Sequence, residues 1–154
     1  MKVLLVQLSD IHIKTAEDAV LQRSSKIVDA VKNLEPEVQA VVCILSGDVT
    51  YSGSEDQFLF ALDFVTQFKT EMEKHLPAGC PVSFVAVPGN HDCDFSEASD
   101  AREILLNAVR ENPSRLADDS FADICLAPQR RFFQFTDAFD LLPRSAKAGG
   151  DHRL

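Results

Sequence analysis

The sequence predicts an α/β fold in which parallel strands alternate with helices, and two observations support this prediction. Three short apolar runs, each typical of a buried strand, lie at residues 3–8, 40–45 and 82–87. The segments between them repeat apolar residues at helical spacing. Strands that alternate with helices pair in parallel through right-handed crossovers, and such sheets bind ligands outside the carboxyl ends of their strands.

The first strand and helix are predicted from residues near the N-terminus. Residues 3–8 are apolar except for Gln7, which is typical of a strand covered on both faces. Thr15 and Asp18 have the spacing of a capping box and predict the start of a helix. Pro36 ends this helix after an apolar stripe formed by Val20, Ile27, Val31 and Leu34.

A second strand and helix follow with similar boundaries. The strand at residues 40–45 precedes another capping box at Ser54 and Gln57, and the helix that begins there should end near Pro77. Its apolar stripe comprises Phe58, Leu62, Val65, Phe68 and Met72. We expect this stripe to pack against the sheet.

Two further helices are predicted after the third strand. The first covers about residues 97–112 and should bury Ala101, Ile104, Leu105, Ala108 and Val109. The second covers residues 130–142, where helical spacing puts Phe132, Phe135 and Phe139 on one side. Packing of these rings in the core or against a partner is favoured over stacking on nucleic acid, because the chain is acidic. The small and polar residues at 143–154 predict a flexible tail.

Charge and composition narrow the classes of function. The 154 residues suffice for one domain, and the net charge of −9 disfavours binding to nucleic acid or anionic lipid. No apolar run approaches the roughly 20 residues of a membrane span, and no signal peptide is recognisable, so we expect a cytoplasmic protein. The four cysteines form no C-x-x-C pair and should be free thiols, with Cys43 in the core. A reactive thiol at Cys93 is the less favoured alternative.

Polar segments that suit a metal centre follow all three strands. They are Asp10-Ile11-His12, Gly47-Asp48 and Gly89-Asn90-His91-Asp92. Carboxylate, imidazole and amide groups together suit divalent ions such as Mn²⁺, Fe²⁺ and Zn²⁺. Two such ions about 3.5–4 Å apart can clamp a phosphoryl group and activate a water molecule. Asp10, Asp48 and Asp92 could be turn or cap residues, which is the favoured interpretation for Asp48 taken alone, but the ordered set favours metal binding.

The residue types also indicate a role for each position. The spacing of Asp10 and His12 puts both on one side of a strand end, within reach of one cation. Asp48 can bridge two cations, and Asn90 offers a neutral oxygen. His91 could protonate the leaving alkoxide while Asp92 holds its far ring nitrogen.

These three segments resemble the first three signature blocks of the calcineurin-like metallophosphoesterases, over about residues 3–95. The resemblance implies a four-layer αββα sandwich with two mixed sheets. It also implies that Asp10 and His12 bind the first metal, that Asp48 bridges and that Asn90 binds the second. His91 would be the catalytic acid and Asp92 would orient it.

The chain also departs from that family pattern in two places. Residues 49–53 hold no arginine, which disfavours the protein Ser/Thr phosphatases. A later lone histidine and a Gly-His-x-His block are not found, and neither His75 nor His152 stands where the pattern needs it. We therefore expect residues 1–142 to be the N-terminal part of a domain whose C-terminal half is absent. Such a fragment should expose apolar surface.

The resulting hypothesis is a metal-dependent phosphoester hydrolase that uses metal-activated water. Phosphomonoesters and small phosphodiesters such as cyclic nucleotides are the expected substrates. Lys14 and Tyr51 lie near the predicted site, where ordinary loop roles are favoured over substrate contact. The alternative hypothesis is a non-catalytic remnant that acts as an interaction or regulatory module, supported by the absent histidines and the phenylalanine-rich segment.

Overall fold

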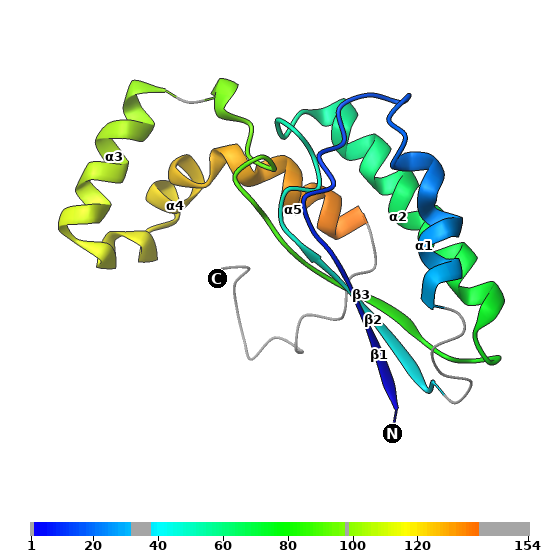
Figure 1. The fold of residues 1–154 in the computed structure, drawn as a ribbon. Helices are drawn as coiled ribbons and strands as arrows, with labels where there is room; N and C mark the ends of the chain where they lie inside the picture. The colour runs from blue at the N-terminus through cyan, green and yellow to red at the C-terminus, as the bar shows by residue number, and fades with distance from the viewer. Residues whose placement is uncertain (1, 32–37, 98, 139–154) are drawn as a thin grey trace.

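The computed structural model describes residues 2–31, 38–97 and 99–138, which form a three-stranded sheet with helices (Figure 1). The parallel strands, in the order β1-β2-β3, are β1 (Val3–Leu8), β2 (Ala40–Ser46) and β3 (Val82–Val87). The α-helices are α1 (Ser24–Val31), α2 (Glu55–His75), α3 (Asp100–Glu111), α4 (Asp119–Cys125) and α5 (Arg130–Ala138). Short 3-10 helices are η1 (Leu21–Arg23), η2 (Phe95–Glu97), η3 (Pro113–Ala117) and η4 (Ala127–Gln129). The predicted α/β class, with one sheet of a partial layered sandwich, is confirmed.

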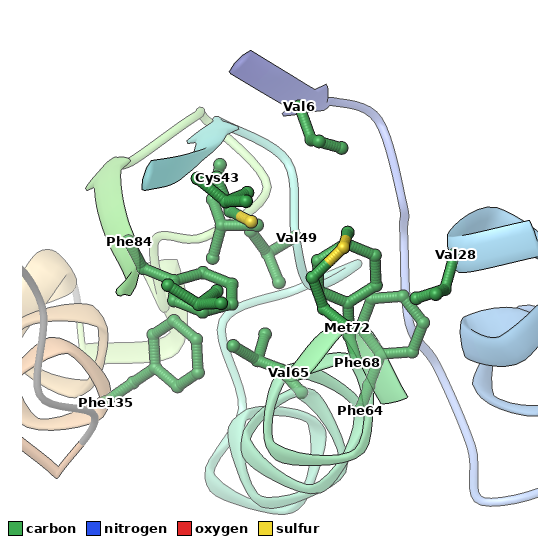
Figure 2. Close-up of a cluster of buried hydrophobic side chains, with 14 of the residues drawn as sticks. Val6, Val28, Cys43, Val49, Phe64, Val65, Phe68, Met72, Phe84 and Phe135 are labelled. Atoms are coloured by element: carbon green, nitrogen blue, oxygen red, sulfur yellow. The ribbon is translucent and has the colours of Figure 1, made fainter. Parts of the chain in front are cut away.

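One face of the sheet carries the hydrophobic core. Val6, Cys43 and Phe84 are paired across the three strands and are all buried. Buried side chains of α2 cover them, as Figure 2 shows, and these include Phe64, Val65, Phe68 and Met72. Consecutive right-handed crossovers that advance in one direction place their helices on the same side, so α1 and α2 share this face.

The other face of the sheet is open in the part of the chain that the structure describes. Val3 and Leu5 of β1 are 40% and 64% exposed, and Val85 and Val87 of β3 are 38% and 53% exposed. The prediction that β1 is covered on both faces is therefore wrong, because both crossover helices lie on one side. The predicted exposure of apolar surface is confirmed.

Helix α5 completes the covered side. Phe58 of α2 has its ring centroid 5.5 Å from that of Phe135 and 6.4 Å from that of Phe132. Phe132 and Phe135 are both buried, which confirms core packing for this segment. Phe139 and the tail predicted at residues 143–154 lie outside the described residues.

Neither predicted capping box forms as expected. The carboxylate of Asp18 accepts hydrogen bonds from the backbone nitrogens of Lys14 and Thr15 at 2.5 and 3.2 Å, which closes a turn ahead of η1 rather than starting a helix. At the second box, Ser54 precedes α2, but its side chain makes no capping hydrogen bond. Gln57 instead reaches back to the loop before the helix.

The segment from η2 to η4 stands apart from the sheet. Figure 1 shows α3 and α4 packed together away from α1 and α2. The Nε of Arg102 donates to the carbonyl of Cys125 at 3.1 Å and joins α3 to α4. The predicted stripe of α3 is only partly covered. Leu105, Ala108 and Val109 are half-buried, whereas Ala101 is exposed and Ile104 is 67% exposed. The elements that pack against α3 include the short η3 and α4, which leave part of its apolar side exposed.

Two predictions from composition can be compared with the fold. Within the described residues, no helix combines the length and apolar character that a bilayer crossing requires. The cytoplasmic location stays a prediction. All four cysteines are free, and burial raises the pKa of the Cys43 thiol to about 12.

Candidate metal centre

The loops after β1 and β2 run side by side at the carboxyl edge of the sheet. The backbone nitrogen of His12 donates to the carbonyl of Asp48 at 3.0 Å. One residue further on, Ile13 forms a parallel bridge with Thr50, and the nitrogen of Tyr51 donates to the carbonyl of Ile13 at 3.0 Å. This ladder extends the pairing of β1 and β2 past the strand ends, and it brings the first two predicted segments together.

Three of the predicted metal ligands have left-handed backbone conformations. The φ angles of Asp10, His12 and Asp48 are 54°, 52° and 54°. These are the residues other than glycine with positive φ in the described chain. Such a conformation costs about 1 kcal/mol or more for each residue, and strain of this kind clusters at functional sites. The backbone is thus held in a shape that the local sequence does not favour.

The turn after β3 closes the site from the third side. The backbone nitrogen of His91 donates to Oδ1 of Asp48 at 3.0 Å. Gly89 leaves room for this contact, because a Cβ atom there would lie 2.1 Å from the same carboxylate oxygen. The third predicted segment therefore packs directly on the second, and a side chain at position 89 is sterically excluded.

The structure brings His12, Asp48 and His91 into one cluster. Each offers a ligand atom, and these atoms all lie within 4.8 Å of one another. The His12 and His91 rings meet edge to face with centroids 4.6 Å apart. Nδ1 of His12 is buried and has no hydrogen-bond partner. A buried nitrogen without a partner is costly unless a ligand satisfies it, so the donor set fits a divalent cation.

Asp10 lies at the border of this cluster. Asp10 is 70% exposed at its side chain and has Oδ1 3.8 Å from Nε2 of His12. Its other carboxylate oxygen accepts a hydrogen bond from the Ser9 hydroxyl at 2.5 Å. Asn90 is exposed on the turn before His91. Their roles as metal ligands stay predictions.

His91 is oriented by Tyr51, which the sequence did not reveal as its partner. Nδ1 of His91 lies 2.6 Å from the carbonyl oxygen of Tyr51. A carbonyl only accepts hydrogen bonds, so this contact puts a proton on Nδ1 and leaves Nε2 directed to other groups. Without a proton, Nε2 of His91 can bind a metal ion. With a proton, it can donate a hydrogen bond to a leaving group. The acceptor is a backbone carbonyl, which every residue type has, so the sequence could not reveal this contact.

Asp92 has a different place from the one predicted. The residue is fully buried, and its Oδ1 accepts from the nitrogen and hydroxyl of Thr50 at 2.8 and 3.1 Å. Its Oδ2 accepts from the nitrogen of Gly89 at 2.9 Å. The expected contact between Asp92 and the His91 ring is therefore wrong, because both carboxylate oxygens bind backbone or hydroxyl donors. Asp92 joins the two loops on which the site is built.

Cys93 does not have the surroundings of a reactive thiol. It is buried, and its sulfur lies 3.6 Å from the carbonyl oxygen of Gly89. Burial raises the pKa of the thiol above its usual value, with the charges of Asp92 and Asp48 acting in the same direction. The neutral thiol is a poor nucleophile, which favours a packing role.

Comparisons of the sequence with known proteins identify a family and a relative. A family profile described as calcineurin-like phosphoesterase matches residues 3–153. An uncharacterized metallophosphoesterase-like protein of Bacillus subtilis, YydB, is 26% identical over 148 residues, which cover 90% of this chain. The chain spans 28% of that relative's length. No solved structure matches the chain significantly.

Proposed function

The chain belongs to the calcineurin-like phosphoesterase family, and from this premise we propose that it acts in metal-dependent hydrolysis of phosphoesters. The observation that supports the proposal is the convergence of His12, Asp48 and His91 from three separate loops. Divalent ions, when bound, supply Lewis acidity and an activated water at such a centre. We propose two ions of Mn, Fe or Zn.

The residues of the chain would share the work as follows. Asp10 and His12 would hold the first ion, Asp48 would bridge and Asn90 would hold the second. The Tyr51 carbonyl fixes the His91 ring, so that Nε2 in its protonated form can donate to the leaving oxygen. Buried Asp92 keeps the loops after β2 and β3 in register while this happens.

The proposed substrates are small phosphodiesters, such as cyclic nucleotides, and phosphomonoesters. The charge of −9 argues against nucleic acid as the partner. The open face of the sheet also bears on function, because its exposed valines and Leu5 form a surface suited to a second sheet. We propose that the second half of the fold occupies this face.

A direct assay tests the proposed activity. The 154-residue chain is incubated with Mn²⁺ and either p-nitrophenyl phosphate or bis-p-nitrophenyl phosphate. Asp48→Asn and His91→Ala should each abolish turnover, and His75→Ala, an exposed histidine at the end of α2, should leave it unchanged. Turnover that survives both site substitutions would contradict the assignment.

A non-catalytic interaction module is the second candidate. The exposed apolar face of β1 and β3 favours it, since such surfaces mark protein contacts. An inactive chain that still binds Mn²⁺ through Asp48, and that binds a separately produced C-terminal half, would support this candidate over the hydrolase.

A further inference from the structure

Lys14 places a positive charge beside the metal centre. It follows His12 by two residues, and its ammonium nitrogen lies 3.9 Å from the centroid of the Tyr51 ring. The Tyr51 ring in turn lies at a tilt of 30° against His91, with centroids 5.4 Å apart. The ammonium group is thus one aromatic ring away from the imidazole of the site.

The backbone fixes this placement from two sides. The pairing of Ile13 with Thr50 and the hydrogen bond from Tyr51 to Ile13 set Lys14 next to Tyr51. On its other side, the backbone nitrogen of Lys14 donates to the Asp18 carboxylate at 2.5 Å. Hydrogen bonds from Lys14 and Thr15 lower the pKa of Asp18, so this anchor stays ionised at neutral pH.

The aromatic contact also keeps the charge away from the carboxylates. An ammonium paired with Asp10 or Asp48 would neutralise the groups that attract cations. The Tyr51 ring, 44% exposed, instead holds the ammonium by a cation–π interaction, which is weak at exposed sites. Such a contact releases the lysine when a stronger anion arrives.

We propose that Lys14 is a substrate-binding residue that contacts a phosphoryl oxygen and selects dianionic phosphomonoesters over monoanionic diesters, with Tyr51 as its resting partner; this inference rests on the proposed function. A lysine acts on phosphate as a point charge, so its attraction scales with the charge of the ligand. Above a second pKa near 6, a monoester carries about twice the charge of a diester.

The test compares the two substrate charges at pH 8 with Mn²⁺ present. Lys14→Met removes the charge and keeps the length of the side chain, Lys14→Arg restores the charge, and Lys26→Met is an exposed control on α1. Lys14→Met should raise KM for p-nitrophenyl phosphate about tenfold and KM for bis-p-nitrophenyl phosphate only about threefold, because half the charge halves the attraction. Lys14→Arg should recover most of the loss. Equal effects on both substrates, or none, would overturn the proposal.

A binding measurement separates this inference from the proposed function. If the wild-type chain hydrolyses neither substrate, the hydrolase assignment for this chain fails. Calorimetric titration with inorganic phosphate and with dimethyl phosphate then tests Lys14 directly. If Lys14→Met weakens the binding of inorganic phosphate clearly more than the binding of dimethyl phosphate, the result would still support charge selection. Unchanged phosphate binding would overturn it.

Discussion

The backbone nitrogen of His91 donates to Oδ1 of Asp48 at 3.0 Å, so a single carboxylate joins the loop after β2 to the turn after β3. The bond orients Asp48 before any ion binds. Its free oxygen and the two imidazoles are therefore arranged in advance, which lowers the cost of forming the metal centre.

Gly89 makes this bond sterically feasible, and Gly89→Ala should break it. The new Cβ would lie 2.1 Å from Oδ1 and 2.5 Å from the backbone nitrogen of Asp48, too close for either to stay in place. We expect Mn²⁺ affinity, measured by calorimetry, to fall at least about tenfold, as for the loss of a group that orients a ligand.

The matched control for this substitution is Gly79→Ala. Nothing lies within 4 Å of a Cβ at position 79, although its φ of 82° imposes strain. It should cost about 1–2 kcal/mol of stability and leave Mn²⁺ affinity unchanged. Equal loss of affinity in both variants would show that general destabilisation, rather than the position of Asp48, is responsible.

Asp92→Asn should lower stability even without metal. Each carboxylate oxygen of Asp92 accepts from a donor on a different loop, and the residue is fully buried. An asparagine nitrogen would face one of those donors, which would lose its acceptor. We expect urea unfolding to show a loss of about 2–3 kcal/mol.

Asp10→Asn supplies the contrast, because the Asp10 side chain is 70% exposed. It should change the stability of the metal-free protein by less than about 0.5 kcal/mol. If Asp92→Asn is equally mild, the buried contacts of Asp92 do not hold the loops together, and a role confined to catalysis would regain support.

The raised pKa of the Cys43 thiol predicts that the protein loses stability at alkaline pH. Burial raises its pKa from 9.0 to about 12, so between these values the unfolded chain releases a proton that the folded chain keeps. The stability is fully present below pH 9 and falls as pH rises towards 12. By pH 10.5 the wild type should lose about 2 kcal/mol more than Cys43→Ala, compared with pH 7. Parallel pH profiles of the two proteins in urea unfolding would contradict this.

Because one face of the sheet is open, we expect that an apolar residue on it can be replaced by a polar one with little change in stability. Leu5→Thr replaces a leucine that is 64% exposed with a residue that also favours strands. It should reduce self-association in analytical ultracentrifugation and the binding of a hydrophobic dye, with stability changed by less than about 0.5 kcal/mol. Leu59→Thr, 54% exposed on α2 away from this face, should leave self-association as it is. Equal effects of both variants would argue against a specific contact surface.

The strands and the polar segments that follow them were predictable, because a buried strand leaves an apolar run and a parallel sheet brings its carboxyl ends together. The partners of Asp92 and His91 were not. Both bind backbone atoms of residues about 40 positions earlier, and backbone atoms are the same for every residue type. The Thr15–Asp18 turn shows a related limit: the sequence pattern of a cap predicts a local hydrogen bond, but not whether a helix follows.

Helical periodicity has the same limit, and Phe132→Ala compared with Ile104→Ala tests it. Both residues lie on amphipathic helices, yet Phe132 is 1% exposed and Ile104 is 67% exposed. Periodicity reports that a helix has an apolar side, and the surrounding elements decide whether that side is covered. Phe132→Ala should cost about 3–5 kcal/mol of unfolding free energy, because α5 packs on α2 through this ring, and Ile104→Ala less than about 0.5 kcal/mol. A large loss of unfolding free energy in Ile104→Ala would show that another part of the protein covers α3 in solution. It would contradict the arrangement in which α3 and α4 pack together apart from the sheet.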